Sequence, residues 1–251
     1  MDKKGQITAF VILGIVILAA VILIFYVRGQ FFFGPATPSS LAARITPIKE
    51  HITSCIQTIS PEYIERIGVQ GGHLKEGEGT SRKRSDIPIS YLCYNIKNEP
   101  TCYNRMLLIS DMQNELNDAI KKGLVTCINL EKYKKGFEIQ AGTLNVNTDI
   151  GQENVIVEVN YPITLTSGDA KASEENFTVS FNYPLGKLYN VAQDIIDAHT
   201  QTGNFDQLNY MLDKRGEYII DVSKPYPDIL YVLKKKDNPY RFQFFIQGEP
   251  A

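Results

Sequence analysis

The chain opens with a short polar segment, and an uncharged apolar run over residues 7–27 follows it directly. At a rise of about 1.5 Å per residue, a helix of this length would measure roughly 32 Å, about the thickness of a bilayer core. Lys3 and Lys4 precede the run and only Arg28 follows it closely, which favours a cytoplasmic N-terminus. The pattern predicts a signal and transmembrane anchor over residues 1–30, with the remainder of the chain on the extracellular side of the cell membrane.

A second segment, residues 31–44, is predicted to be a juxtamembrane spacer. Gly and Pro recur between residues 34 and 40, and neither residue type favours the continuation of a helix. An extracellular domain is expected to follow over residues 45–251. A division of this domain into two lobes, near 45–135 and 136–251, stays open at this point.

Three segments behind the spacer carry apolar residues at spacings of three and four, the period of an amphipathic helix. These segments cover residues 45–59, 110–128 and 188–196. Ser60 and Pro61 follow the first segment in the form of an N-cap and a first helical residue. We therefore expect the first helix to stop there and a short second helix to begin.

Residues 75–86 are rich in Gly, Ser and charged side chains, and they are predicted to form an exposed loop. This loop contains the basic cluster Arg82-Lys83-Arg84, and a solvated loop is the favoured interpretation of such a charge run. A short strand is expected directly after it, at residues 89–94.

Farther along the chain the apolar period changes from helical to two. Residues 155–165 and 177–183 alternate without interruption, which predicts a long antiparallel hairpin with one buried face. Pro162 lies on this hairpin and suggests the edge or the end of a strand. Three further strands are expected at 218–222, 229–235 and 240–246. Because strands and helices are mixed without a βαβ alternation, we expect an α+β fold in which antiparallel sheet packs with amphipathic helices.

Charge and motifs exclude some classes of function. Without the first 40 residues, the chain has 23 basic and 27 acidic residues, a net charge of about −4, which is not the basic footprint of a nucleic-acid-binding protein. The three histidines, His51, His73 and His199, are scattered, and no linear motif of a hydrolase, kinase or dinucleotide-binding protein occurs. No catalytic residue, cofactor or metal site is predicted. A hydrolase remains an alternative, because catalytic carboxylates leave no linear signature.

The four cysteines are the best-defined constellation, and their even number suits an oxidising compartment. Cys55 and Cys127 each fall on the apolar face of a predicted helix, so packing these faces together would bring the sulfurs close. Cys93 and Cys102 flank a short segment that contains a Pro turn. We expect the pairs Cys55–Cys127 and Cys93–Cys102, one of three connectivities. Closing the longer loop would contribute roughly 4–5 kcal/mol on chain-entropy arguments. Reduced core cysteines and a zinc site are the alternatives, and the absence of a Cys-x-x-Cys pair disfavours zinc.

A sequon for N-glycosylation, Asn176-Phe177-Thr178, lies on the second strand of the predicted hairpin. Phe177 belongs to the alternating apolar set of that strand, so Asn176 is expected on the opposite, exposed face. A glycan would fit there.

The segment Lys3-Lys4-Gly5-Gln6, directly before the apolar run, resembles the class III signal peptide of archaeal type IV pilin-like proteins. In that family a prepilin-type peptidase cuts after the Gly. The resemblance therefore implies processing between Gly5 and Gln6 and an apolar helix that can pack into a filament core. The chain departs from the pilin pattern at Phe10, where many pilins carry Glu, and in its spacer. These departures favour a minor pilin-like protein or a monomeric surface protein with a pilin-like anchor.

The remainder of the chain resembles single-pass archaeal surface proteins of uncharacterised activity, in the segments Ser54-Cys55-Ile56, 67–72 and 185–192. We expect a membrane-anchored cell-surface protein that serves as a pilin-like structural or adhesive module. A monomeric anchored domain that binds a ligand or partner, and an anchored extracellular hydrolase, are the alternatives. The expected partners are a lipid bilayer, a prepilin-type peptidase, and pilin-like or envelope proteins.

Overall fold

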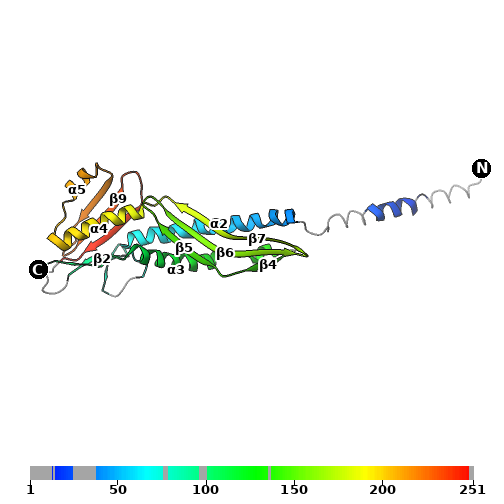
Figure 1. The fold of residues 1–251 in the computed structure, drawn as a ribbon, viewed down its shortest axis with the longest axis horizontal. Helices are drawn as coiled ribbons and strands as arrows, with labels where there is room; N and C mark the ends of the chain where they lie inside the picture. Colours follow the sequence, from blue (N-terminus) through cyan, green and yellow to red (C-terminus); the bar gives the residue numbers. More distant parts are fainter. Residues whose placement is uncertain are drawn as a thin grey trace, which may run out of the picture.

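A computed structural model of the protein describes residues 13, 15–24, 38–75, 79–95, 101–134 and 137–248. From residue 38 onward these residues form an elongated body with two β-sheets, one nearer each end (Figure 1). One long helix, α2 (Pro38–Val69), runs from the sheet at one end toward the sheet at the other. The body belongs to the α+β class, with antiparallel pairing in most of its strands, as the alternating and helical periods predict.

The predicted membrane-spanning helix over residues 7–27 is wrong. In this stretch the described helical residues are Leu13 and 15–24, and ten consecutive helical residues measure roughly 15 Å at about 1.5 Å each. Among the residues that the structure describes, no helix combines the length and the apolar character needed to cross a membrane.

Helix α2 begins at Pro38, inside the expected spacer, and continues through Pro61, where the sequence predicts a break. Pro is favourable at the first helical position because its missing N–H has no partner there. The break at Ser60 fails to form because the apolar stripe continues across it: Ile56, Ile64 and Ile67 are all buried. Tertiary packing of this stripe therefore outweighs the loss of one hydrogen bond at Pro61.

The second long helix, α3 (Ile109–Cys127), packs against α2 and confirms the predicted amphipathic helix. Its buried residues are Met112, Leu116, Ile120 and Leu124. A short 3₁₀ turn, η1 (Glu131–Tyr133), leads from it to the first of the two sheets described below.

We call the sheet that packs on the first part of α2 the proximal sheet. Its strands are β4 (Glu138–Ala141), β5 (Asn145–Ile150), β6 (Val155–Ser167) and β7 (Ala170–Phe181). Strand β6 pairs with β7 along one side and with β5 and β4 in turn along the other. Pro162 therefore lies inside a central strand, where the sequence predicts an edge. It is tolerated because the β6–β7 register shifts between Asn160 and Ile163, at the point where pairing changes from β5 to β4.

We call the second sheet the distal sheet. Its strands are β1 (Ser81–Arg84), β2 (Ile87–Tyr94), β3 (Tyr103–Asn104), β8 (Tyr218–Ser223), β9 (Ile229–Lys235) and β10 (Arg241–Ile246). Their order is β1-β2-β10-β9-β8, with β3 beside β2 and a parallel contact between β2 and β10. Because β2 and β10 come from opposite halves of the chain, the proposed lobes 45–135 and 136–251 are interleaved rather than separate.

Helix α4 (Leu185–Thr202) covers one face of the distal sheet, and α5 (Gln207–Asp213) lies against its edge strand β8. The inward side chains of β9 and β10, among them Leu233, Phe242 and Phe244, are almost fully buried in the main core. The end of α2 reaches the same sheet, since the Tyr240 hydroxyl donates to the Ile64 carbonyl oxygen at 2.9 Å.

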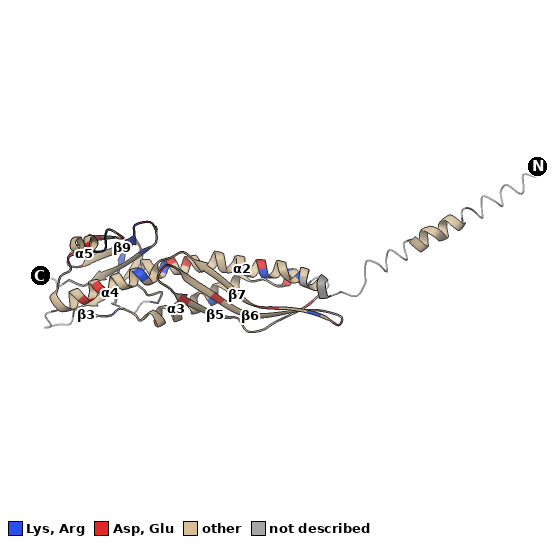
Figure 2. Cartoon of the chain, turned by 45° about the horizontal axis from the view of Figure 1, so that its top comes forward, with Lys and Arg blue, Asp and Glu red and all other residues tan. Residues whose placement is uncertain are grey.

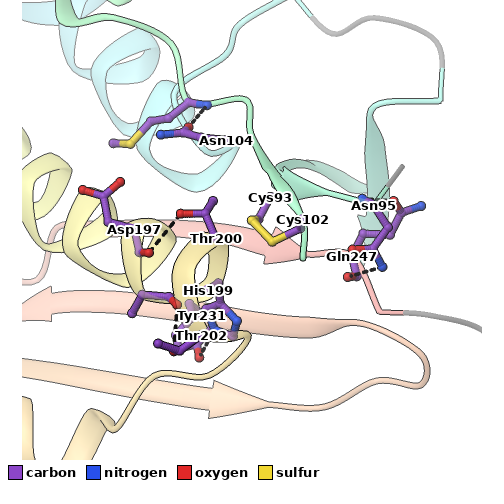
Figure 3. The surroundings of a disulfide bond; sticks show 12 residues. Cys93, Asn95, Cys102, Asn104, Asp197, His199, Thr200, Thr202, Tyr231 and Gln247 are labelled. Atoms are coloured by element: carbon purple, nitrogen blue, oxygen red, sulfur yellow. Dashed lines mark hydrogen bonds between the residues drawn. A yellow bond between two sulfur atoms is a disulfide. The ribbon is translucent and has the colours of Figure 1, made fainter. Parts of the chain in front are cut away.

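The structure contains two disulfides, Cys55–Cys127 and Cys93–Cys102, in agreement with the expected pairing. The first links α2 to α3 beneath the proximal sheet. The second joins β2 to the residue before β3 in the distal sheet, beside α4 (Figure 3).

Candidate functional site

The face of the distal sheet opposite α4 carries the candidate site, a groove of about 410 Å³. The groove is lined by residues of β1, β2, β8, β9 and β10 and of the turns beside them: Arg84, Ser85, Ile87, Ile89, Asp221, Val222, Ser223, Val232, Lys234, Arg241 and Gln243. We call it the cationic groove, because it has three basic side chains and one acidic side chain.

Two of the three cations have no internal counter-charge. Lys234 Nζ lies 3.2 Å from Asp221 Oδ2, the one carboxylate of the lining. Arg84 and Arg241 are exposed and form no ion pair within the part of the chain that the structure describes. Their guanidinium groups are therefore available to an anionic ligand, and a planar guanidinium can bind a carboxylate through two parallel hydrogen bonds.

The strand register brings like charges together in this groove. Arg241 on β10 lies directly opposite Lys234 on β9. Like charges directly opposite each other in an antiparallel pair destabilise the sheet by roughly 0.2–1 kcal/mol. Such an arrangement is unfavourable for folding, and it concentrates positive charge where a ligand can neutralise it.

The floor of the groove is partly apolar: Ile89 and Val232 line it, and both belong to a small cluster separate from the main core. Ile89, Leu230 and Phe245 are almost fully buried in this cluster, and Tyr91 and Val232 pack against it. An apolar floor with cations around it lowers the local dielectric, so a charge bound there interacts more strongly than it would on an open surface.

The basic cluster Arg82-Lys83-Arg84 is on strand β1 and not in a loop, which corrects the sequence-based expectation. The alternation of a strand sends its members to different surroundings. Arg82 lies 2.6 Å from the buried Asp228 and over the Phe245 ring at 5.6 Å. Lys83 alternates to the opposite face, and Arg82 is held by Asp228, so Arg84 alone of the three lines the groove.

Asp228 is the centre of a second polar site beside the groove. Its Oδ2 accepts hydrogen bonds from Arg82 at 2.6 Å and from the Tyr91 hydroxyl at 2.8 Å, and its Oδ1 accepts from the Gly248 N–H at 3.0 Å. Burial and the Asp228 carboxylate raise the pKa of Tyr91 to about 12. Both oxygens of this buried carboxylate accept hydrogen bonds from within the chain, so we assign it to the architecture of the sheet.

The turn that presents Arg84 is unusual. Ser85 and Asp86 connect β1 to β2, and both have positive φ values, 50° and 64°. Two consecutive positive φ values define the type I′ turn of tight hairpins, in which Asn and Gly are the usual residues. This turn fixes Arg84 at the rim of the groove, and Ser85 adds a hydroxyl to the lining.

The three histidines lie in separate surroundings. The ring of His51 accepts a 3.4 Å hydrogen bond from the Asn129 N–H on the surface, and His73 follows the end of α2. His199 is buried on α4 with its Nε2 2.8 Å from the Tyr231 hydroxyl, close to the Cys93–Cys102 disulfide (Figure 3). Burial lowers the pKa of His199. Among the described residues there is also no group of three His, Cys, Asp or Glu side chains that could hold a metal ion.

The remaining predicted site residues are only partly described. Asn176 is exposed on β7, as the strand pattern predicts, and its Oδ1 accepts a 2.9 Å hydrogen bond from Asn160 on the neighbouring strand. Its modification by a glycan stays a prediction. Gly5 and Gln6, the predicted processing site, lie outside the described residues.

Sequence reasoning missed the groove because Arg84 on β1 lies about 150 positions before Lys234 and Arg241 on β9 and β10. A partial signal was present: Arg82 and Arg84 have the two-residue spacing of a strand and precede a predicted strand closely. No protein-family model, curated protein or solved structure matches this chain.

Proposed function

We propose that the chain is a pilin-like surface module with a structural or adhesive role outside the cytoplasm, and that the cationic groove is its contact surface for an anionic partner. The observation that carries the proposal is that Arg84 and Arg241, which form no ion pair among the described residues, lie around a partly apolar floor on the sheet face opposite α4. Surfaces that combine an apolar centre with free Arg side chains are typical of binding sites.

Two further features support this proposal. Both disulfides suit an oxidising compartment, and the four cysteines are all used in them. The segment Lys3-Lys4-Gly5-Gln6 resembles a pilin-type signal and would make a prepilin-type peptidase a processing partner. Envelope or pilin-like proteins are the partners we propose for the folded body.

Binding of a soluble polyanion tests the contact surface. The probe is poly-L-glutamate, and the test variant of the full chain is R84E/R241E. The matched control, K83E/K122E, makes the same change in net charge at exposed lysines outside the groove. The test variant is expected to bind at least about tenfold more weakly than wild type, and the control is expected to lose much less. Equal losses in both variants would contradict a specific groove.

Processing tests the pilin-like part separately. The chain is coexpressed with a prepilin-type peptidase, and the mature N-terminus is determined by sequencing. We expect a chain that begins at Gln6, and we expect Gly5→Leu to block the cleavage. An intact N-terminus on the wild-type chain would exclude pilin-type processing without affecting the binding role of the groove.

A further inference from the structure

The two sheets of the molecule carry opposite net charge. Residues 138–181, which contain the proximal sheet, have seven acidic and one basic residue, a net charge of −6. The distal segments 81–94 and 218–246 have eight basic and four acidic residues, a net charge of +4. Figure 2 marks these charges along the two parts of the body. The overall net charge of −2 therefore hides a strong separation of charge within the chain.

The acids of the proximal sheet are largely without counter-ions. Two of the seven are paired: Glu153 with Lys187 and Lys235, and Glu174 with Lys49. The other five form no ion pair among the described residues, and all five are exposed: Glu138, Asp149, Glu158, Asp169 and Glu175. Unpaired charge thus remains on both sheets, positive on the distal one and negative on the proximal one.

The outward face of the proximal sheet is mostly polar. Glu158 lies on the central strand β6 between the buried residues Val157 and Val159, so its side chain points away from α2 and the core. A row of amides crosses the three strands beside it, since Asn160 is directly opposite both Asn145 and Asn176. We call this surface the acidic face. It offers carboxylates together with amide donors and acceptors.

We propose that the anionic partner of the cationic groove is the acidic face of a second copy of this chain. This inference rests on the proposed function of the groove and identifies its ligand. The supporting argument is charge complementarity: carboxylates on strands β6 and β7 of one copy meet the guanidinium groups of Arg84 and Arg241 on the next. Each copy has unpaired cations in its groove and unpaired carboxylates on its acidic face, so each surface can be neutralised by the opposite surface of another copy.

The contact joins two unlike surfaces, because the groove and the acidic face belong to different sheets. Such a heterologous contact leaves one groove free at one end of a pair and one acidic face free at the other. Repetition of the contact would produce a ring where the rotation between copies closes and an open chain where it does not. A glycan on Asn176 would lie within the acidic face, so the experiment uses unglycosylated protein.

Sedimentation velocity of the full chain, kept in solution with a mild non-ionic detergent, tests the proposal. The four proteins are wild type, R84E/R241E, E158K/E175K and the control K83E/K122E. For wild type at about 50 mM salt we expect association that weakens about tenfold or more at about 500 mM, where the Debye length is only a few ångströms. Each interface variant alone is expected to stay largely monomeric, and the control is expected to associate like wild type.

A mixture of the two interface variants provides the decisive arm. R84E/R241E keeps the wild-type acidic face and E158K/E175K keeps the wild-type cationic groove, so an equimolar mixture should form pairs. Association through the exposed apolar residues 15–24 would be the same in all four proteins and cannot produce this pattern.

Three outcomes would overturn the inference. They are a wild type that is monomeric up to roughly 100 µM at low salt, association that survives both interface variants, and a mixture that fails to pair although both variants keep the wild-type thermal unfolding midpoint. If wild type is monomeric but still binds poly-L-glutamate through Arg84 and Arg241, the proposed function stands and its partner is a different anionic molecule.

Discussion

The proximal and distal sheets differ mainly in the faces that their helices leave uncovered. The proximal sheet rests its apolar face on α2 and α3, and its outer face is mostly polar along β6, where Glu158 and Asn160 alternate with buried valines and Ile156 is half-buried. The distal sheet has α4 on one face and a second small apolar cluster on the other, surrounded by cations. The proximal face thus offers exposed carboxylates without counter-ions, and the distal face offers unpaired arginines beside apolar side chains, so the two faces differ in the sign of their unpaired charge.

A different disulfide lies near each sheet, and removing the one that closes the longer loop gives the largest expected effect. Cys55–Cys127 closes a separation of 72 residues and Cys93–Cys102 one of 9 residues. On chain-entropy arguments, C55S/C127S should lower the free energy of unfolding by about 4 kcal/mol and C93S/C102S by about 2.5 kcal/mol. Denaturant unfolding of both variants measures the two losses. A larger loss from the distal pair would contradict this ranking.

The next prediction concerns the polar site that fixes β1 to the distal sheet. Asp228→Ala removes the partner of Arg82, Tyr91 and the Gly248 N–H at once. We expect a loss of about 3 kcal/mol in the free energy of unfolding, because the part-buried Tyr91 hydroxyl and Gly248 N–H lose their acceptor and Arg82 loses its counter-charge. Asp221→Ala is the matched control, since its ion pair with Lys234 is exposed and should contribute less than about 1 kcal/mol. Similar losses in the two variants would show that Asp228 has no special structural role.

The free energy of unfolding should depend on pH through His199, which lies on the helix that covers the distal sheet and not near the proximal sheet. Burial against Tyr231 lowers the pKa of His199 below its unfolded value of 6.5, so the unfolded chain binds a proton first as the pH falls. Stability is therefore expected to decrease from pH 6.5 downward, until the folded protein also protonates His199. Urea unfolding at neutral and mildly acidic pH measures this loss, and His199→Asn should reduce its pH dependence. An unchanged pH dependence in the variant would contradict the assignment.

The smallest effect is expected at the β1–β2 turn. Asp86 has a φ of 64°, a value that Gly adopts without strain, so Asp86→Gly should raise the free energy of unfolding by about 0.5–1 kcal/mol. Asp169→Gly, at a turn residue without a positive φ, should lower it slightly because Gly adds freedom to the unfolded chain. Thermal unfolding of the two variants compares them, and a loss of stability in Asp86→Gly would contradict the type I′ geometry.

Much of the fold follows from residue periodicity. The period-two alternation from Val155 onward and the apolar stripe of α3 both extend over many residues. Patterns of this length fit one type of secondary structure much better than the other. The cysteine pairing followed from the helix faces that carry Cys55 and Cys127. Local signals failed where tertiary packing decided the outcome: the apolar stripe of α2 continued through Pro61, although that residue locally favours a break.

The candidate site was much harder to predict than the fold. Arg84 and Arg241 are more than 150 positions apart, and a parallel contact between β2 and β10 brings their strands into one sheet. No linear pattern encodes such a long-range pairing. The predicted anchor was wrong for a different reason. The absence of charge over residues 7–27 indicates only that a helix there would tolerate apolar surroundings.

One variant tests the central claim, that the cations of the groove serve binding at a cost to folding. Arg241→Gln removes the like charge opposite Lys234 and also one of the two free guanidinium groups. The free energy of unfolding should therefore rise by roughly 0.2–1 kcal/mol, while poly-L-glutamate binding measured on the same sample weakens severalfold. A variant that binds like wild type, or that loses stability, would contradict the claim.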